Sequence, residues 1–478
     1  FGVSGSVGLA SVSGGLAGLS KTASHEWPEV RCRAMDLDVA WSGGAAAIAK
    51  ELRADGPLEV GLTASGRFGL SLRDTELPEN AGKVFGAGDV VLVSGGARGV
   101  TAEAAVALAD EGVVLALLGR SPMPDAEPDW LSAWAEESEI KRALMARAET
   151  KMAPKELETA YGRVTADREI RKTLDRIAAR GGKAVYVAVD VRDGDAVADA
   201  AAALRAEHGP VRGVVHGAGV LADRFIEDKT REQFETVYDT KVEGMRALLS
   251  ATEHDPLKAI AIFSSSTGRY GRKGQSDYAV ANEVLNKMAQ AEAARREDCR
   301  VVSVNWGPWA GGMVTPALEK VFAAEGVGLI GLEAGAHYLA QELTAPGPVE
   351  IVLVGDAQKA ETPPQPPPVP AVLVLAFALD LDVAHYAFLE AHVINGKAVL
   401  PTAVILEWLS HGALHANPGM NFHGVNGLKI AKGVILEDDT PCRLRFLTGK
   451  PRPEGDVVLV AAEMRSTNGQ GKDVLHAS

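Results

Sequence analysis

The feature that most constrains the fold is a regular alternation, from residue 89 onward, of short apolar runs rich in β-branched residues with segments long enough for helices. Near-continuous apolar strands separated by helices are typical of a parallel sheet covered on both faces. We therefore expect residues 81–355 to form a doubly wound α/β domain of the Rossmann type. The seven expected strands are Val90–Val93, Val113–Leu118, Ala184–Val189, Gly213–His216, Ala259–Phe263, Arg300–Asn305 and Glu350–Val354.

The segment between Pro124 and Arg180 interrupts this alternation. It is charged and rich in Ala and Glu, and it has no strand pattern. Because it is longer than one crossover helix, we interpret it as a helical insertion, from about residue 124 to 180.

Residues 1–80 are interpreted as a partial α/β unit without a phosphate-binding loop of its own. They contain one helical stretch (Leu16–Trp27), one strand (Arg31–Asp36) and a hairpin-like pair around Ser65 and Gly66. Phe1 opens a Gly/Ser-rich stretch that is not a signal peptide, so we interpret the chain as a piece of something larger.

Residues 356–370 are proline-rich and are expected to form a stiff interdomain linker. Beyond them, residues 371–478 contain one apolar helix, Thr402–His411, and later alternating runs such as Val457–Ala461. This pattern predicts an α+β unit in which a helix packs on an antiparallel sheet.

Composition excludes several classes of function. The net charge of −14 over 478 residues argues against nucleic acid as a partner. Cys32, Cys299 and Cys442 have no metal-ligand spacing and form no disulfide framework, which suits a reducing cytoplasm. The longest apolar run, Ala371–Leu379, is too short to span a membrane. We expect a cytoplasmic protein with no metal and no membrane contact.

A glycine-rich turn follows the first strand and opens the first helix. Such a turn lets backbone N–H groups and a helix N-terminus approach a pyrophosphate. The second strand ends with Arg120 where an NAD site would place an acidic residue, and an arginine there suits the 2′-phosphate of NADPH. The expected NADPH-binding residues are Ser94, Gly95, Gly96, Arg98, Gly99, Val100, Gly119, Arg120, Ser121, Asp190, Val191, Gly217, Ala218 and Gly219.

The fifth strand ends near Ser265, and Tyr278 follows in the next segment. Reduction of a carbonyl by hydride needs a proton donor at the forming alkoxide and a second donor that polarises the carbonyl. A phenol is a poor acid–base group unless a neighbouring cation lowers its pKa. A Tyr, a Ser and a Lys beside the nicotinamide would supply this set.

At these residues the sequence resembles the short-chain dehydrogenase/reductase superfamily, and specifically the ketoreductase domains of modular synthases. Asn282 stands four residues after Tyr278, Lys241 lies 37 residues before it, and Ser265 lies 13 residues before it. The resemblance implies that Tyr278, Ser265, Lys241 and Asn282 are catalytic and that the substrate is a 3-oxoacyl thioester on acyl carrier protein.

The resemblance extends beyond the active site. Residues 15–38 and 58–72 look like the structural subdomain that precedes such ketoreductases. Residues 305–322, together with the helical insertion, look most like ketoreductases of polyunsaturated-fatty-acid synthases, and Pro308 in this segment joins the expected cofactor-binding residues. Other domains of the same synthase are therefore expected partners.

A short motif bears on the handedness of the product. Ketoreductases that make the D-alcohol usually carry Leu-Asp-Asp after the fourth strand, whereas this chain has Leu221-Ala222-Asp223. Tyr270 stands where ketoreductases of opposite handedness place a Trp. Asp223 and the missing Trp favour a 3R product.

His392, Gly396 and Pro401 have the spacing of the catalytic histidine motif in synthase dehydratases, which are built of two hotdog folds. About one hotdog follows the linker, and no acidic partner motif is visible. Three interpretations remain: half of a double hotdog, a homodimer in which Glu407 reaches His392 across the interface, and a vestigial or structural hotdog.

Two alternatives to a synthase ketoreductase share part of this pattern. A free-standing short-chain reductase of small ketones would have the same fold and Ser/Tyr/Lys set, but the displaced Lys241 and the linked hotdog speak against it. A non-catalytic scaffold module is disfavoured by the intact catalytic set.

Overall fold

The computed structural model describes residues 9–38, 41–54, 56–75, 82–148, 152–312, 314, 318–320, 322, 327–355, 373–436, 441–454, 457–468 and 471–478. The chain divides into two compact units, one of residues 1–36 and 70–363, the other of residues 37–69 and 364–478. The expected linker 356–370 lies outside the described residues.

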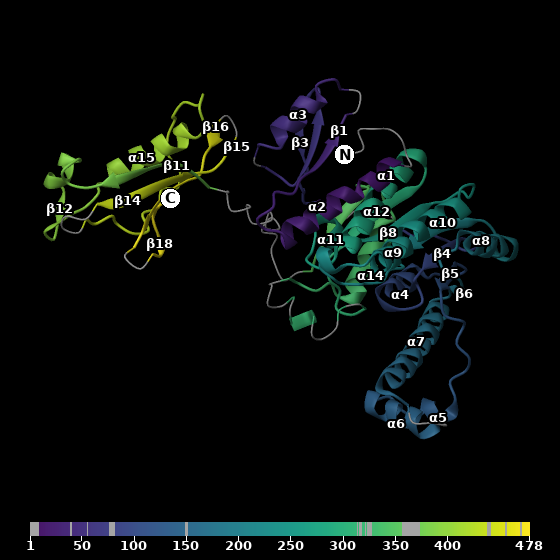
Figure 1. The fold of residues 1–478 in the computed structure, drawn as a ribbon. Helices are drawn as coiled ribbons and strands as arrows, with labels where there is room; N and C mark the ends of the chain where they lie inside the picture. The colour runs from purple at the N-terminus through teal and green to yellow at the C-terminus, as the bar shows by residue number, and fades with distance from the viewer. Residues whose placement is uncertain are drawn as a thin grey trace. The chain divides into compact units, whose positions relative to one another are not determined.

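The first unit is built on a seven-stranded parallel sheet, and all seven expected strands are present (Figure 1). The order across the sheet is β10-β9-β8-β7-β4-β5-β6, so the chain starts in the middle and winds outward in both directions. The strands are β4 (Val90–Ser94), β5 (Val114–Gly119), β6 (Lys183–Ala188), β7 (Val211–His216), β8 (Ala259–Ser265), β9 (Arg300–Trp306) and β10 (Glu350–Leu353). The prediction of a doubly wound Rossmann-like sheet is confirmed.

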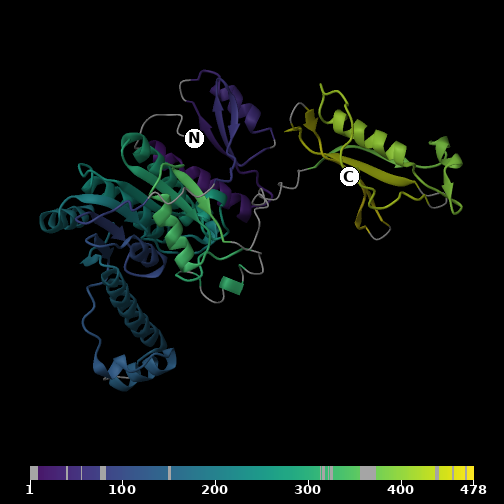
Figure 2. The ribbon, with the colours of Figure 1, turned by 180° about the vertical axis from the view of Figure 1, so that it is seen from behind.

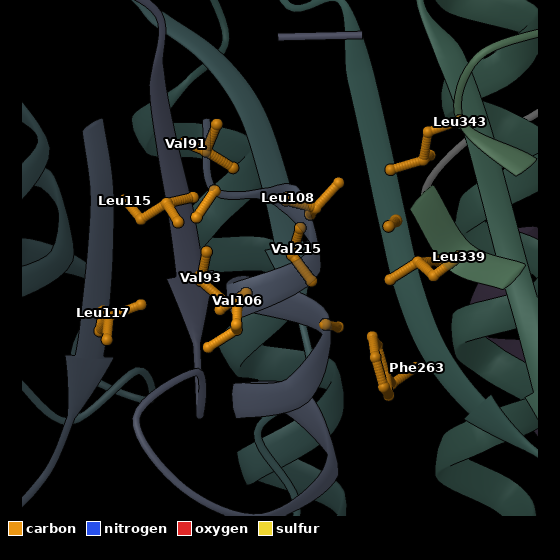
Figure 3. Packing of buried hydrophobic residues seen from close by; sticks show 14 of the residues in the cluster. Val91, Val93, Val106, Leu108, Leu115, Leu117, Val215, Phe263, Leu339 and Leu343 are labelled. Atoms are coloured by element: carbon orange, nitrogen blue, oxygen red, sulfur yellow. The ribbon is translucent and has the colours of Figure 1, made fainter. Parts of the chain in front are cut away.

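Alternate side chains of the central strands enter two separate cores. Val91 and Val93 of β4 belong to one hydrophobic cluster, which is drawn in Figure 3, and Val90 and Leu92 belong to the other. Because successive strand residues point to opposite faces, a strand that is apolar at every position must be covered on both sides.

Helices on both faces complete these cores. The face of Val91 is covered by α4 (Gly99–Leu108), the end of α7 (Pro154–Ala179) and α14 (Leu332–Glu342). The opposite face is covered by α8 (Gly194–His208), α10 (Gly244–Ala251) and α12 (Ser276–Arg295). The remaining α-helices between β7 and α12 are α9 (Arg231–Tyr238) and α11 (Ser266–Tyr270).

The segment between β5 and β6 is helical, as predicted. It contains α5 (Asp129–Ser132), α6 (Glu137–Arg147) and the long helix α7. The buried residues of α7 include Ile170 and Ile177 near its C-terminal end, which pack on the sheet. Figures 1 and 2 show α5 and α6 at the other end of α7, away from the sheet. Only the last turns of α7 therefore serve as the crossover.

The N-terminal segment contributes two helices and a small sheet. The helices are α1 (Leu9–Ser13) and α2 (Gly15–Glu26), and the sheet has the order β1-β2-β3, with β1 (Ala34–Leu37), β2 (Glu59–Thr63) and β3 (Gly66–Gly69). The helix, strand and hairpin expected here are present. The helix α3 (Gly44–Glu51) was not expected, because its short alanine-rich sequence has only two buried residues and so no clear apolar face.

The C-terminal residues form a helix on an antiparallel sheet of order β11-β14-β17-β18, which agrees with the α+β expectation. Ile405 and Leu409 of the helix α15 pack with Leu444 and Phe446 of β14. The helix runs four residues beyond its expected end. The elements are β11 (Val374–Leu381), β12 (Val393–Ile394), β13 (Lys397–Ala398), α15 (Thr402–His415), β14 (Cys442–Thr448), β15 (Arg452–Glu454), β16 (Val457–Leu459), β17 (Ala462–Thr467) and β18 (Asp473–Ala477).

No helix among the described residues is both long enough and apolar enough to cross a membrane.

Candidate active site

The candidate site lies where the order of the sheet reverses. β4 pairs with β5 on one side and with β7 on the other, so the turns after β4 and β7 leave in opposite directions. In open α/β sheets ligands bind at such a switch point, beyond the carboxyl ends of the strands. The residues selected from the sequence follow β4, β5, β6, β7, β8 and β9 and therefore share this edge.

The turns after β4 and β7 pack closely enough to require glycine. Gly95 has a φ of +71°, and a Cβ there would lie 3.0 Å from the Cα of Ala218. At Gly217 a Cβ would lie 2.2 Å from the hydroxyl oxygen of Thr101. A side chain at Gly95 would push the two turns apart, and one at Gly217 would collide with Thr101 of α4.

The same turn leads into the N-terminus of α4. Its N-cap residue Arg98 makes no capping hydrogen bond with its side chain, and the first turn of the helix carries no acidic residue. The first N–H groups of a helix lack partners within the helix, so this end can receive an anion. The glycine turn and the helix end fit the pyrophosphate of a dinucleotide.

Arg98 and Arg120 lie on the β5–β6 side of this cradle, and both are exposed. Burial raises the pKa of Tyr186, and the nearby charge of Arg98 partly opposes this rise. The charge of Arg120 likewise helps to lower the pKa of Asp190. The Tyr186 hydroxyl donates to the Ser121 carbonyl at 2.8 Å. Two cations therefore flank the end of β5, as a 2′-phosphate requires.

Asp190, which was expected near the adenine, is held by its neighbour. Its carboxylate accepts hydrogen bonds from the Arg192 side chain, with the shortest at 2.6 Å, and these bonds lower its pKa. Val191 is buried in the core and can offer only backbone to a ligand. Pro308 follows β9, and its carbonyl accepts the N–H of Ile330 at 2.8 Å.

A buried histidine links the glycine turn after β4 to Lys241. His216 is 0% exposed, and its Nε2–H donates to the carbonyl of Lys241 at 2.8 Å. Its Nδ1 therefore accepts the hydroxyl proton of Ser94 at 2.7 Å. Burial lowers the pKa of His216 to about 3, so the ring is neutral at physiological pH.

From the sequence, Gly217 was selected as a cofactor-binding residue, but no role was assigned to His216 before it. The side-chain role was missed because Ser94 and His216 are 122 residues apart in sequence. The one signal in the sequence was that His216 is a polar residue at the end of an otherwise mostly apolar strand.

Lys241 lies in a π-helical turn, Asp239–Glu243 (η2), between α9 and α10. Turns of this type are rare in proteins as a whole, and those that occur are often found at functional sites. The lysine side chain is buried, and its Nζ donates to the Phe263 carbonyl at 3.0 Å. Burial lowers the pKa of Lys241 to about 7.

The structure brings Tyr278, Ser265, Asn282 and Lys241 together. Lys241 Nζ lies 5.1 Å from the centre of the Tyr278 ring. Ser265 and Asn282 both lower the pKa of Tyr278 by hydrogen bonding. Asn282 Nδ2 donates to the Tyr278 carbonyl at 2.8 Å, and Ser265 Oγ accepts the N–H of Thr267 at 3.1 Å. The hydroxyl proton of Ser265 is thus left for another acceptor.

The expectation that Lys241 lowers the pKa of Tyr278 is not met in this structure. Burial raises the pKa of Tyr278 to about 12, with only Asn282 and Ser265 acting against it. The physical reason is the direction of the ammonium group, which binds the Phe263 carbonyl rather than the phenol oxygen. The lysine thus packs beside the ring without supplying a charge to the hydroxyl.

The residues expected to control the handedness of the alcohol product are Asp223 and Tyr270. Asp223 is exposed, and its carboxylate accepts a hydrogen bond from Gln275 Nε2 at 3.0 Å. The Tyr270 hydroxyl is buried without a hydrogen-bond partner among the described residues, and burial raises its pKa. Gln275 was not selected from the sequence, since no local pattern joins it to Asp223.

A buried ion pair supports the start of α12. Lys229 Nζ lies 2.8 Å from Asp277 and also donates to the Ala222 carbonyl at 2.9 Å. Asp277 in turn accepts the N–H of Tyr278 at 2.9 Å. This pair connects the Asp223 loop to Tyr278, and sequence reasoning missed it.

In the C-terminal unit, His392 is half-buried and precedes the hairpin of β12 and β13. Its Nδ1–H donates to the Val399 carbonyl at 2.7 Å, so Nε2 is the nitrogen available as a base. Glu407 is exposed on α15. Within the described residues these two side chains make no contact with each other.

Comparisons with known proteins agree with this geometry. Residues 89–311 match the family described as KR domain. The chain is 35% identical over 449 residues to a component of the polyunsaturated fatty acid synthase of Thraustochytrium sp., which covers 90% of this chain and 16% of that protein. It is 33% identical over 178 residues to polyketide synthase PksL of Bacillus subtilis, covering 36% of this chain and 4% of that protein.

Among solved structures, the chain is similar to the PlmKR1 ketoreductase from the first module of phoslactomycin biosynthesis in Streptomyces sp. HK803. The TM-score is 0.57 with 27% identity, covering 70% of this chain and 69% of the other.

Residues 89–311 therefore match the KR domain family, and they contribute to a Rossmann-like parallel sheet. The relatives of this part of the chain are proteins of polyketide and polyunsaturated-fatty-acid synthases, and its fold is similar to that of a ketoreductase. The chain spans only a small fraction of the two synthase proteins above, 16% and 4% of their lengths.

The buried ammonium group of Lys241 gives a stability prediction. Below pH 7 the lysine is protonated in both folded and unfolded chains, so folding must desolvate a charge. As the pH rises from 7 towards 10.5 the folded chain releases its proton first, and the wild-type protein gains stability. Lys241→Met should therefore stabilise the domain at pH 6 by roughly 3–5 kcal/mol, with the gain shrinking towards pH 10.

Urea unfolding of both proteins at pH 6, 8 and 10, followed by circular dichroism, measures this difference. Lys155→Met, at an exposed position of α7, is the matched control and should show no such pH dependence. A Lys241→Met gain that is absent or equal at all three pH values would contradict a buried lysine with a lowered pKa.

Proposed function

We propose that this chain reduces a 3-oxoacyl thioester, carried on acyl carrier protein, to the 3-hydroxyacyl thioester with NADPH. The single observation that carries the proposal is the convergence of Ser265, Tyr278, Asn282 and Lys241 at the edge of the sheet where the glycine turn lies. The match to the KR family supports the same reaction class.

NADPH supplies a hydride to the carbonyl carbon when it is bound. The chain's own residues would donate a proton and a hydrogen bond to the carbonyl oxygen. The Tyr278 hydroxyl, kept protonated by its pKa of about 12, donates a proton to the carbonyl oxygen as negative charge develops there. Ser265 donates its hydroxyl hydrogen bond to the same oxygen and polarises the carbonyl beforehand. Both donors act best where water is excluded; Lys241 and Asn282 beside them are buried, and the two donors are half-buried.

The cofactor would be held along the carboxyl ends of β4 and β5. Backbone groups of Gly95, Gly96 and Gly99 would surround the pyrophosphate, and Arg98 and Arg120 would bind the 2′-phosphate. Neither guanidinium forms a salt bridge within the described residues, so binding a phosphate breaks no existing pair.

The handedness of the alcohol follows from the mouth of the site. Asp223, whose carboxylate accepts a hydrogen bond from Gln275, would border the entering acyl thioester, and position 270 holds Tyr instead of Trp. We infer a 3R product.

A second candidate function concerns the C-terminal unit, which we infer to be a dehydratase-like hotdog. The observation that favours it is the orientation of His392, whose Nδ1–H is fixed by Val399 so that Nε2 can remove an α-proton. Elimination of water also needs an acid for the leaving hydroxyl. Glu407 of a second copy would supply it in a homodimer.

The choice of cofactor rests on the two arginines. Arg120→Asp should weaken NADPH binding by about 10- to 100-fold, the loss of one charged hydrogen-bonded contact, with little effect on NADH. Titration of cofactor fluorescence gives both dissociation constants. The same change at Arg142, an exposed arginine on α6, should leave both constants unchanged. Equal affinity of the wild-type chain for NADH and NADPH would contradict the assignment.

The role of Tyr278 is tested by removing its hydroxyl. Tyr278→Phe should lower the rate of thioester reduction by at least about 100-fold, while NADPH binding stays intact, because the general acid is lost but the ring still packs on Lys241. Tyr338→Phe, at a 39% exposed tyrosine on α14, is the matched control. A Tyr278→Phe protein that reduces thioesters at the wild-type rate would refute the proposal.

The dehydratase interpretation predicts weak dehydration by a monomer. With a 3-hydroxyacyl thioester, a monomeric chain should give little enoyl product, and a dimer mixed from His392→Ala and Glu407→Gln chains should regain activity that each variant lacks. His423→Ala, at an exposed histidine, should change nothing. Rapid enoyl formation by a demonstrated monomer would overturn the shared site.

A further inference from the structure

Helix α2 is fixed against the start of α12, the helix that carries Tyr278. A Cβ at Gly18 would lie 2.4 Å from the carbonyl oxygen of Ala279, the residue after the tyrosine, so the two helices touch through their backbones. Lys21 of α2 is 4% exposed and forms an ion pair with the fully buried Glu283 of α12. The C-terminal end of α2 therefore has a defined position relative to Tyr278.

The last residue of α2, Glu26, joins two loops of the site with one carboxylate. Its Oε1 accepts the N–H of Gly274 at 2.8 Å, and its Oε2 accepts the N–H of Ile226 at 2.7 Å. These loops are 48 residues apart in sequence, and they also meet directly where the Arg224 N–H donates to the Gly274 carbonyl at 2.9 Å and where Gln275 Nε2 donates to Asp223 at 3.0 Å. Charged hydrogen bonds to backbone are among the stronger polar contacts in proteins.

The two loops carry the residues that border the substrate entrance. The first contains Asp223, three residues before Ile226, and the second ends at Gln275, whose side chain binds Asp223. Tyr278 follows Gln275 by three residues. A change in the spacing of the loops would therefore move Asp223 relative to the proton donor.

We propose that Glu26 is a positioning residue that determines which face of the 3-oxo carbonyl is presented for reduction. The inference rests on the proposed function of the site. Glu26 touches neither the cofactor turn nor the catalytic set, and it lies outside residues 89–311, the segment that matches the KR family. The N-terminal segment would then take part in specificity as well as in support.

Glu26→Gln tests the bridge, because an amide has one acceptor oxygen and its NH2 group opposes the second backbone N–H. The KM for a 3-oxobutanoyl thioester should rise about tenfold, the scale of one lost charged hydrogen bond, with kcat within about twofold of wild type. The proportion of 3S alcohol should increase, measured by chiral chromatography, and the KM for NADPH should stay unchanged.

Two further variants separate the bridge from the charge. Glu29→Gln removes a carboxylate from an exposed position three residues later and should behave as wild type. Glu26→Asp keeps the charge but is one methylene too short to reach both loops, so it should shift the product ratio as Glu26→Gln does. It also serves as the test if Glu26→Gln fails to fold.

Amide hydrogen exchange provides a readout that needs no substrate. Ile226 and Gly274 should exchange faster in both Glu26 variants than in wild type and in Glu29→Gln. If exchange rises but KM and the product ratio do not change, Glu26 has a structural role only and the inference is overturned. If the wild-type chain does not reduce the thioester at all, the proposed function fails instead.

Discussion

The hydrogen bonds of one buried, neutral imidazole hold the two halves of the candidate site together. His216 lies between the Ser94 hydroxyl and the Lys241 carbonyl, at 2.7 and 2.8 Å. A protonated ring could not accept from Ser94, and the burial that lowers its pKa to about 3 prevents that state at physiological pH. The glycine turn after β4 and the π-helical turn of Lys241 are thereby held in fixed positions relative to each other.

Burial also sets the protonation states of the candidate catalytic residues. Without a carboxylate partner, Lys241 has a pKa of about 7, and Tyr278, without a cation at its hydroxyl, has a pKa of about 12. Desolvation disfavours the charged form of each group, so the site rests with a protonated phenol and a readily deprotonated lysine. A protonated phenol is the state that reduction of a carbonyl requires.

Much of the fold could be predicted from sequence because each buried strand of a parallel sheet is a short, continuous apolar run that can be recognised locally. β4 and β5 are apolar at nearly every position, and their alternate side chains enter the two cores. The grouping of Ser265, Tyr278, Asn282 and Lys241 was predicted from spacing within a resemblance. Contacts such as Glu26 with Ile226, 200 residues apart, and the direction of the Lys241 ammonium leave no periodic signal and required the structure.

The central claim is that the site at the end of the parallel sheet reduces a 3-oxoacyl thioester. The most direct measurement follows NADPH absorbance while the wild-type chain turns over a 3-oxobutanoyl thioester, with chiral analysis of the alcohol. The account predicts one NADPH consumed for each 3-hydroxybutanoyl thioester formed, predominantly of 3R configuration. No NADPH consumption by a folded chain that binds the cofactor would contradict it.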